Sequence, residues 1–456
     1  MARIAGVDSS TQSVKIVVRD SDSGALLAQA SHPHPDGTEV DPQHWLTALN
    51  AVINEVGGLD SLDAISIGGQ QHGMVLLDVD GNVIRPALLW NDTRSAPQAA
   101  AINDAFPDIH LKAGSQLVAS FTASKVRWVL ENEPANAAKI AAIALPHDWL
   151  SWKLTGSSEI SEIFTDRSDA SGTGYFNPST NQYIDEIVQW VSGKSDVIMP
   201  RIVAPGEVGA KIGKTVIACG AGDNAGAALG IGATVGDLVI SLGTSGTAFA
   251  VSSTPAHDKS GEVAGFADAS GNYLPLACTL NAAKVFDSTA KLLGVDFEKF
   301  SQLALQANPG ADGLMMLPHF DGERTPNRPD AEGAILGITH SNFTSENIAR
   351  ASIEGVIAGL AYATEALRKE NVQISRVLLV GGAARNAAVQ QITSEIFGLS
   401  IHIPTPGEYV SEGAAIQAAW AFNGQPPQWS QSVMKTVAAA PQPAVLARYL
   451  AAISAI

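Results

Sequence analysis

A short apolar strand, a turn of small hydroxyl or glycine residues and a second apolar strand occur in that order in each half of the chain. The first copy is centred on Val7-Asp8-Ser9-Ser10-Thr11 and the second on Leu242-Gly243-Thr244-Ser245-Gly246. Such turns present consecutive backbone N–H groups, which can hold phosphate oxygens without a positive surface. Two unrelated β-hairpins can produce the same pattern. The repeat therefore favours, without requiring, two similar halves that each contribute a phosphate-binding turn.

The length of the chain agrees with a division into two domains. Its 456 residues exceed the range in which a single hydrophobic core usually keeps growing. Apolar residues make up 46% of the chain and charged residues 16%, which is typical of globular proteins and unlike disordered ones. Either half is long enough to bury a core of its own.

The net charge of the chain and its two cysteines limit which partners and which cellular compartment are expected. With 28 Lys and Arg against 45 Asp and Glu, the net charge of -17 repels nucleic acid and anionic membrane surfaces, so neither is an expected partner. A nucleotide ligand would need local N–H groups, helix N-termini or a bound cation. Cys219 and Cys278 form no CxxC motif, and no signal-peptide pattern opens the sequence. We therefore expect a reducing, cytoplasmic location without a zinc site.

The pattern of apolar residues predicts an α/β layer that occurs twice. A helix should begin after Asp41, a capping residue followed by Pro42, because Trp45, Leu49 and Val52 share one helical face. Strands are expected around this helix and again in the second half, where a helix is expected over residues 387–397. The predicted strands cover residues 3–7, 13–19, 25–31, 63–67, 238–242, 247–251, 263–267, 272–276, 376–380 and 400–403.

Two aspartates are candidates for the chemistry of a phosphoryl transfer. Asp8 ends an apolar strand beside the first turn, where a carboxylate can hold Mg²⁺ near a transferred phosphate, although without further context a turn-capping role is the simpler interpretation. Asp223 follows Gly220-Ala221-Gly222 and precedes a run of small residues that begins a helix. It can accept a hydroxyl proton at the floor of a cleft, or it can simply cap the helix.

Two polar segments are candidates for sugar recognition. Gln71 and His72 lie in a glycine-rich turn over residues 68–73, and Trp90 precedes a polar run that begins at Asn91. A site that pairs each hydroxyl of a polyol rejects analogues that lack one, and an aromatic ring often supports a sugar face. A structural histidine and ordinary packing of Trp90 are the alternatives. The common nucleotide fingerprints are absent from both turns and from Gly381-Gly382-Ala383.

Two long segments resemble the signatures of the FGGY carbohydrate kinases. Residues 120–132 read Ser-Phe-Thr-Ala-Ser-Lys-Val-Arg-Trp-Val-Leu-Glu-Asn, and residues 333–338 read Gly-Ala-Ile-Leu-Gly-Ile, continuing through Asn347-Ile348 to Ala-Ser-Ile-Glu at 351–354. The resemblance spans nearly the whole chain and is strongest to the members that act on D-xylulose. Further similar segments are residues 85–92, 222–224, 242–246, 317–326 and 380–385.

The resemblance implies an actin-like ATPase fold with two ribonuclease-H-like halves and an interdomain catalytic cleft. Residues 1–234 would bind sugar and Mg²⁺, and residues 235–456 would bind ATP, for ATP-dependent conversion of D-xylulose to D-xylulose 5-phosphate in xylose catabolism. Catalysis would involve Asp223 as the general base and Asp8 near the metal. The implied binding residues are Thr11, Gly243 and Thr244 for phosphates, Gly382 and Asn386 for adenosine, and Gln71, His72, Asp223, Asn224 and Trp90 for the sugar.

The sequence departs from the family pattern at two places near the expected site. Many relatives have Gly-Thr where Ser9-Ser10 stands, and Met where Gln71 stands, so the identity of the sugar is less firmly implied than the kinase chemistry. Another ketose or polyol, such as ribulose, gluconate or glycerol, is the first alternative acceptor. A non-kinase actin-like ATPase is the alternative from another class, because a fold alone does not exclude it. The sequence is compatible with a homodimer.

Overall fold

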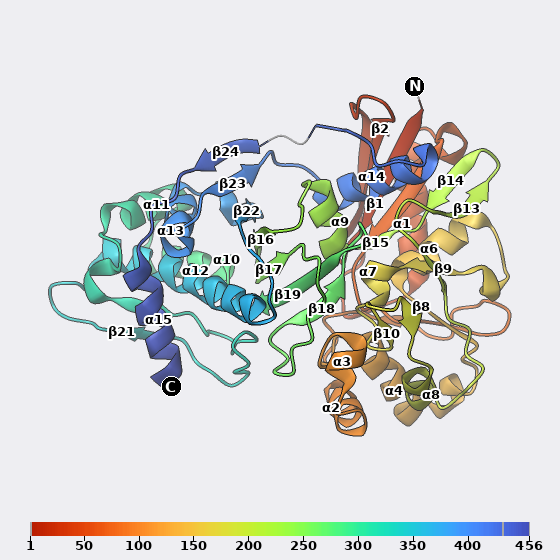
Figure 1. Cartoon of the computed structure of the whole chain (residues 1–456), viewed down its shortest axis with the longest axis horizontal. Coiled ribbons are helices and arrows are strands. Elements are labelled where there is room, and N and C mark those ends of the chain that lie inside the picture. The colour runs from red at the N-terminus through yellow and green to blue at the C-terminus, as the bar shows by residue number, and fades with distance from the viewer. Residues whose placement is uncertain (1, 431–432, 456) are drawn as a thin grey trace. The chain divides into compact units, whose positions relative to one another are not determined.

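The structure, a computed structural model, describes residues 2–430 and 433–455. The chain forms two compact units: the first comprises Met1–Ala233, Gly265–Leu274 and Gly407–Gln431, and the second Thr234–Ala264, Pro275–Pro406 and Ser432–Ile456. There are two seven-stranded sheets with helices packed on them (Figure 1): one lies in the first unit, and the other lies in the second unit except for its residues 265–267 and 273–274, which are assigned to the first. The predicted two-domain α/β fold is confirmed. The roles expected of residues 1–234 and 235–456 stay predictions.

The sheet of the first unit has a buried central strand whose two faces meet different helices. Along β1, Ala5 and Val7 belong to one apolar core and Ile4 to another, as the alternation of side chains in a strand requires. The sheet order is β13-β14-β5-β1-β2-β3, with β15 beside β5. The strands are β1 (Arg3–Ser9), β2 (Ser13–Asp20), β3 (Leu26–Pro33), β5 (Ala64–Gly69), β13 (Val208–Ile212), β14 (Thr215–Ala218) and β15 (Ala221–Gly222).

Helices α1 (Pro42–Glu55) and α6 (Pro146–Thr155) contribute to the core on one face, where the Trp45 side chain is 1% exposed. Asp41 caps α1 by accepting a hydrogen bond from the Gln43 N–H at 2.9 Å, as the sequence predicted. The remaining helices of this unit are α2 (Ala96–Ala105), α3 (Ile109–Ala113), α4 (Thr122–Asn132), α5 (Pro134–Ala137), α7 (Arg167–Ala170), α8 (Asp185–Ser192), α9 (Asp223–Gly230) and α14 (Tyr409–Asn423).

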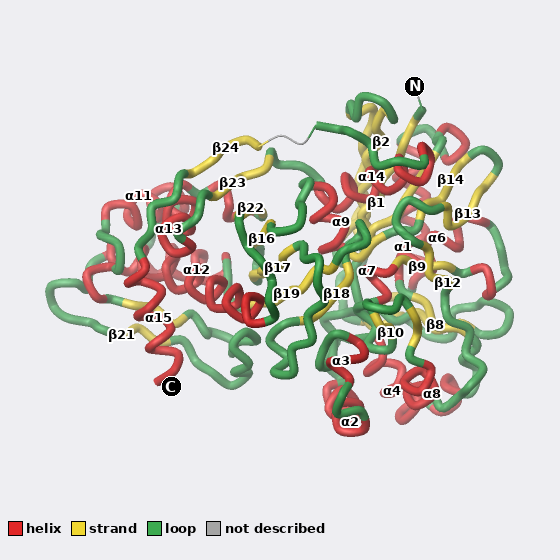
Figure 2. The backbone as a smooth tube through the Cα atoms, viewed as in Figure 1, coloured by secondary structure: helices red, strands yellow, loops and turns green. Residues whose placement is uncertain are grey.

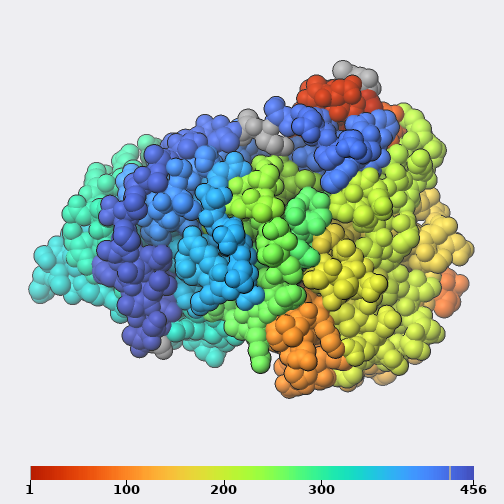
Figure 3. Space-filling model, in the orientation of Figure 1, coloured from red at the N-terminus to blue at the C-terminus, as the bar shows by residue number. Residues whose placement is uncertain are grey.

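Helix α14 lies on the other face and brings a late segment of the chain against the first strand. A Cβ atom at Gly6 would lie 1.9 Å from the Ser411 carbonyl oxygen, and one at Gly413 would lie 1.9 Å from the Gly226 carbonyl oxygen. Backbones this close leave no room for any side chain, so glycine allows α14 to pack on both β1 and α9. Figure 3 shows this late segment, in blue, beside the red N-terminal residues.

The sheet of the second unit repeats the order and the strand directions of the first. Its order is β18-β19-β17-β16-β22-β23-β24, in which β16 pairs antiparallel with β17 and parallel with β22, as β1 does with β2 and β5. The internal repeat predicted from the two turns is therefore a repeat of topology. The strands are β16 (Asp237–Leu242), β17 (Gly246–Ala250), β18 (Ala264–Ala267), β19 (Tyr273–Thr279), β22 (Arg376–Val380), β23 (Ile401–Pro404) and β24 (Val433–Val437).

The second unit has one continuous apolar core, to which the 25-residue helix α12 (Ser345–Lys369) contributes most of its length (Figure 2). Thr344 caps α12 by accepting a hydrogen bond from the Asn347 N–H at 3.3 Å, and Arg368 and Lys369 occupy its last turn, where cations interact favourably with the helix dipole. The other helices are α10 (Ala283–Leu293), α11 (Phe297–Gln306), α13 (Ala387–Phe397) and α15 (Pro443–Ala455).

Short strand pairs complete the two units. In the first unit they are β4 (Glu39–Val40) with β7 (Ala87–Leu88), β6 (Val75–Leu77) with β8 (Ala142–Ala144), β9 (Phe164–Asp166) with β12 (Arg201–Val203), and β10 (Phe176–Asn177) with β11 (Gln182–Tyr183). The second unit has β20 (Met315–Leu317) with β21 (Ala334–Leu336). Among the described residues, no helix is both long enough and apolar enough to cross a membrane.

A buried ion network joins α12 to its neighbours. Arg350 is 1% exposed, and its Nε donates to the Glu354 carboxylate at 2.7 Å, while another guanidinium nitrogen donates to Glu395 on α13. The same guanidinium donates to the Ala307 carbonyl after α11, and the Gly310 N–H donates to Glu354 at 2.9 Å. One side chain therefore ties three segments of the second unit together.

We predict that Arg350→Met lowers the free energy of unfolding by about 3–5 kcal/mol, because two buried carboxylates lose their cation. Urea denaturation followed by circular dichroism measures the loss. Arg368→Met on the same helix is the matched control: the Arg368 and Glu365 side chains are 42% and 40% exposed, and removing such a pair should change stability by less than about 1 kcal/mol. Equal losses in the two variants would contradict the prediction.

Candidate active site

The carboxyl ends of three parallel strands meet at one edge of the first unit's sheet. Ser9 of β1 lies opposite Gly69 of β5, and Gly69 lies opposite Gly222 of β15. The segments that follow these strand ends contain most of the polar residues singled out in the first half of the sequence. In open α/β sheets, ligands commonly bind at the carboxyl ends of the strands. The register thus brings Asp8, Gln71, His72 and Asp223 to the same edge.

Asp223 is the first residue of α9 and is partly buried. Its Oδ1 accepts hydrogen bonds from the backbone N–H and the side-chain amide of Asn224, at 2.7 and 2.9 Å. Burial is the main cause that raises the pKa of Asp223 to about 7, and the negative charge of Asp8 adds to the increase. A carboxylate with a pKa near neutral is suited to accept a proton from a hydroxyl group.

Asp8 is 6% exposed and accepts a hydrogen bond from the Ser10 hydroxyl at 2.5 Å. Burial raises the pKa of Asp8 to about 6, while Ser10 and Lys15 lower it. Lys15 itself forms an ion pair with Glu408 at 2.6 Å. The carboxylate is therefore held at a strand end beside the small-residue turn, as the sequence pattern suggested.

The first turn is hydrogen-bonded to the aromatic residue predicted for the sugar site. The Trp90 indole N–H donates to the Thr11 hydroxyl at 2.9 Å, and that hydroxyl donates to the Gln70 side chain at 3.2 Å. The Trp90 side chain remains 47% exposed, so its ring presents a free face while its nitrogen is held. Thr11 and Trp90, which the sequence assigned to different ligands, are thus direct neighbours.

His72 adopts a left-handed backbone conformation, with φ of 68°, that non-glycine residues rarely hold. The Thr122 hydroxyl donates to the His72 carbonyl at 3.1 Å, and the His72 Nδ1 lies 2.5 Å from the Gly172 carbonyl oxygen. The rings of Phe121 and Phe266 flank the imidazole at centroid distances of 4.9 and 5.6 Å. Strain of this kind persists where surrounding contacts enforce it, and it is common at ligand sites.

Gln71 connects this turn to Asp223. A Cβ atom at Gly222, the residue before Asp223, would lie 2.7 Å from the Gln71 Nε2, so the amide lies against the backbone of residue 222. The Gln71 amide also donates to the Ser168 carbonyl at 3.4 Å on α7. A glycine at position 222 is therefore required for the predicted sugar residue to lie beside the predicted base.

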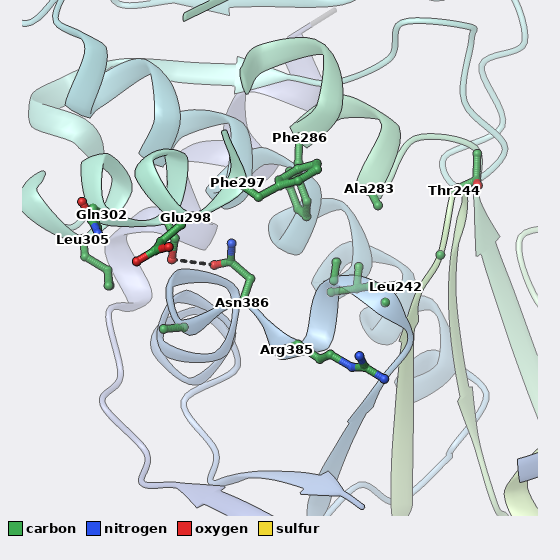
Figure 4. Close-up of a pocket in the computed structure, with 15 residues that line it drawn as sticks. Leu242, Thr244, Ala283, Phe286, Phe297, Glu298, Gln302, Leu305, Arg385 and Asn386 are labelled. Atoms are coloured by element: carbon green, nitrogen blue, oxygen red, sulfur yellow. Dashed lines mark hydrogen bonds between the residues drawn. The ribbon is translucent and has the colours of Figure 1, made fainter. Parts of the chain in front are cut away.

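The second unit contains a cavity of about 760 Å³ (Figure 4). Four of the five residues predicted to bind ATP line it, whereas Thr11 lies in the first unit, and Phe286 and Phe297 supply aromatic surface. A Cβ atom at Gly381, where φ is 94°, would lie 2.4 Å from the Leu242 carbonyl oxygen, which shows how closely the turns after β16 and β22 approach. The cavity is large enough for a small-molecule ligand. The predicted residues on its wall are Gly243, Thr244, Gly382 and Asn386.

The orientation of the Asn386 amide is set by three donors. Its Oδ1 accepts hydrogen bonds from the Ser301 hydroxyl at 2.9 Å and from the Ala388 and Val389 N–H groups at 2.9 and 3.2 Å, capping α13. The amide nitrogen is therefore left as the donor for a bound ligand. Figure 4 shows this nitrogen directed toward Phe286 and Phe297.

Three residues near the site were not assigned a role from the sequence. Lys125 lies in the first signature segment, His147 follows Pro146 at the start of α6, and Ser168 lies on α7. Lys125 contacts carbonyls four to six residues earlier, whereas the Ser168 hydroxyl and two of the carboxylates around His147 have partners from distant segments. Only Lys125 carried a sequence signal, its place in the signature. The binding and catalytic roles of the predicted residues stay predictions.

Comparison with known proteins places the chain in one family. Residues 3–235 match the N-terminal domain of the FGGY family of carbohydrate kinases, and residues 238–422 match its C-terminal domain. The xylulose kinase of Streptomyces rubiginosus is 41% identical over 442 residues, which cover 93% of this chain and 89% of that protein.

Solved structures give the same grouping. The xylulose kinase from Bifidobacterium adolescentis has 42% sequence identity and a TM-score of 0.94, with 99% of both chains covered. The gluconate kinase from Lactobacillus acidophilus, at 24% identity and a TM-score of 0.88 over 100% of this chain and 96% of that one, shares the fold. The chain therefore belongs to the FGGY family of carbohydrate kinases.

Proposed function

We propose that this carbohydrate kinase transfers the γ-phosphoryl group of ATP to the 5-hydroxyl of D-xylulose, releasing ADP and D-xylulose 5-phosphate. The observation that carries the proposal is the meeting of Asp223 with the Gln71-His72 turn at one sheet edge. The similarity to xylulose kinases over most of the length of both chains supports D-xylulose as the acceptor. The low cysteine content, two residues in the whole sequence, and ATP as the donor support a cytoplasmic location.

Asp223 acts as the general base in this mechanism. Its carboxylate accepts the proton of the sugar hydroxyl while that oxygen forms a bond to the γ-phosphorus and the bond to the leaving ADP oxygen breaks. Asn224 holds one carboxylate oxygen through two hydrogen bonds, which orients the base. Gln71, His72 and Trp90 orient the acceptor, and such positioning supplies much of the rate enhancement in phosphoryl transfer.

Asp8 is the residue proposed to hold Mg²⁺. Its buried carboxylate is a hard oxygen donor, and a single carboxylate suffices for this ion, which keeps several waters and phosphate oxygens as ligands. When bound, the ion neutralises charge on the transferred phosphates. The Ser10 hydroxyl fixes one oxygen of Asp8 at 2.5 Å, so the carboxylate is oriented before any ligand arrives.

The nucleotide is proposed to occupy the cavity of the second unit. Phe286 and Phe297 offer apolar surface for the adenine ring, and the fixed Asn386 amide offers a donor to a ring nitrogen. The turn at Gly243 and Thr244 supplies N–H and hydroxyl donors for phosphate oxygens, and the role of Thr11 toward phosphate is assigned to its backbone N–H, because its hydroxyl donates to Gln70. A panel of ketoses and polyols in an ADP-release assay tests the acceptor; faster turnover of gluconate or glycerol than of D-xylulose would reverse the assignment.

We predict that Asp223→Asn lowers kcat by about 10²–10⁴-fold, because the amide cannot accept the hydroxyl proton. Nucleotide affinity, measured by calorimetry with ADP, should stay unchanged, since the nucleotide residues lie on other elements. Asp60→Asn, at an exposed aspartate of the first unit, is the control and should retain full turnover. Wild-type turnover in Asp223→Asn would refute the role of the base.

We also predict that kcat/KM for the sugar falls tenfold per pH unit below about pH 7. Burial raises the pKa of Asp223 to about 7, so the carboxylate is protonated and inactive as a base below that pH. A pH series of initial rates measures this acidic limb. A flat profile between pH 5 and pH 8, in enzyme that remains folded, would contradict the prediction.

Lys125 stabilises the segment that packs against the Gln71-His72 turn. It is fully buried, and its ammonium group donates to the Ala119 carbonyl at 3.1 Å and to the carbonyls of Ser120 and Phe121. Phe121 and the next residue, Thr122, both contact His72. Burial lowers the pKa of Lys125 to about 7, which shows how strongly this position disfavours a charge. Burying an ammonium group is unfavourable, so its presence here indicates that the three carbonyls require a hydrogen-bond donor.

We predict that Lys125→Met raises the KM for the sugar by about tenfold and leaves the KM for ATP unchanged, because the segment that holds His72 relaxes. Steady-state kinetics with each substrate varied in turn measures both constants. Lys112→Met, which removes an exposed ion pair with Glu186, is the matched control. Equal changes in both KM values would indicate a general loss of structure instead.

A further inference from the structure

Four buried ionisable side chains gather between the strand ends and α7 in the first unit. The His147 Nε2 lies 3.2 Å from an oxygen of Asp148, 3.4 Å from one of Asp166 and 3.2 Å from one of Asp169. None of the four residues is more than 2% exposed. Among the described residues, no group of three or more His, Cys, Asp and Glu side chains, this one included, could hold a metal ion.

The cluster needs a positive charge. Unpaired carboxylates in a water-free interior are strongly disfavoured, and the oxygens of Asp169 have no hydrogen-bond donor of good geometry in the described part of the chain. Burial alone would lower the pKa of His147, but Asp148, Asp166 and Asp169 outweigh it and raise that pKa well above its ordinary value. The three carboxyl groups within 3.4 Å of its Nε2 therefore favour the imidazolium form of His147.

Hydrogen bonds lead from this cluster to both halves of the sugar site. The Asp166 carboxylate caps α7 by accepting from the N–H groups of Ser168 and Asp169, at 2.6 and 3.1 Å. The Ser168 hydroxyl accepts from the Gly222 N–H at 3.0 Å, and the Ser168 carbonyl accepts from the Gln71 amide. Helix α7 thus touches the residue before Asp223 and the side chain that lies beside it.

The imidazole ring also packs directly against the strand ends. A Cβ atom at Gly220, where φ is 89°, would lie 2.5 Å from the His147 Nδ1, and one at Gly69 would lie 3.1 Å from the His147 Cβ. The His147 side chain therefore packs on both of these paired segments, the one that leads into the Gln71-His72 turn and the one that leads into Asp223. A different side chain at position 147 would therefore change the packing against both segments.

The cluster is electrostatically coupled to the proposed base. Burial is the main cause that raises the pKa of Asp169 to about 6; the charges of Asp166 and Asp223 add to the increase, and His147 opposes it. Asp148, whose pKa burial raises to about 7, faces His147 from α6. The negative charge of Asp8, on β1, also raises the pKa of Asp223. Of these ionisable groups, His147 alone can carry a positive charge.

We propose that His147 is a positioning residue for the general base. Its imidazolium holds α7 against Gly222 and Gln71, and it offsets the negative charge of the carboxylates near Asp223. The inference rests on the proposed function, because it assigns a task in relation to Asp223 as the base. His147 does not contact the reacting atoms in this proposal. It acts through Asp166, Asp169 and Ser168.

The test is the pH dependence of kcat/KM for D-xylulose in three variants. His147→Gln removes the cation, so the acidic limb should move up by about one pH unit, with about tenfold less activity at pH 6. Asp169→Asn removes a carboxylate near Asp223, so its limb should move down. The double variant removes one charge of each sign, and its limb should return close to the wild-type position. His44→Gln, at an exposed position of α1, is the control with an unchanged limb.

A purely structural role predicts a different result. Loss of packing alone would lower activity in both single variants without moving their limbs in opposite directions, and would make the double variant worse than either; that result overturns the proposal. If His147→Gln does not fold, Asp169→Asn alone decides, since an unmoved limb in that variant refutes the charge coupling. If Asp223 is not the general base, Asp223→Asn retains turnover. That result separates an error in the proposed function from an error in the role of His147.

Discussion

The parallel register of β1, β5 and β15 is the constraint on which the first unit's site depends. It places Ser9, Gly69 and Gly222 in one row, so the segments after these residues leave the sheet side by side. Glycines at the row and on the helices behind it allow the backbones to approach: Gly6 accepts α14 and Gly413 accepts α9. Because Asp223 is the first residue of α9, the packing of a late helix, α14, sets the position of the proposed base.

This arrangement buries several ionisable groups, and removing their charges from water costs free energy. Asp8, Lys125 and His147 are each at most 6% exposed, and burial opposes the charge of every one of them. The buried network around Arg350 in the second unit differs, because it connects helices of a core and lies outside the lining of the cavity proposed for the nucleotide. Stability and activity are therefore expected to be coupled at His147 and separable at Arg350.

Local sequence signals predicted the elements that depend on neighbouring residues. The strand Arg376–Val380 and the helix Ala387–Phe397 lie at the predicted residues, and Asp41 caps α1 as predicted. The cluster around His147 was not predicted, since its carboxylates come from three elements and no spacing marks them as partners. The joining of Gly407–Gln431 to the first unit was equally invisible, because it depends on backbone contacts between distant glycines.

The two sheets share one topology but differ in the residues around the turns of their central hairpins. The first turn comes after Asp8, and the ends of its sheet are packed with charged and hydrogen-bonded side chains; the second turn, at Gly243, comes after Leu242 and opens on a cavity walled by Phe286. A sugar presents hydroxyls in every direction, which only oriented polar groups can recognise, whereas a nucleotide base offers an apolar face that packing can hold. One shared topology thus carries two differently built strand ends, and the proposed ligands, a sugar in the first unit and a nucleotide in the second, account for that difference.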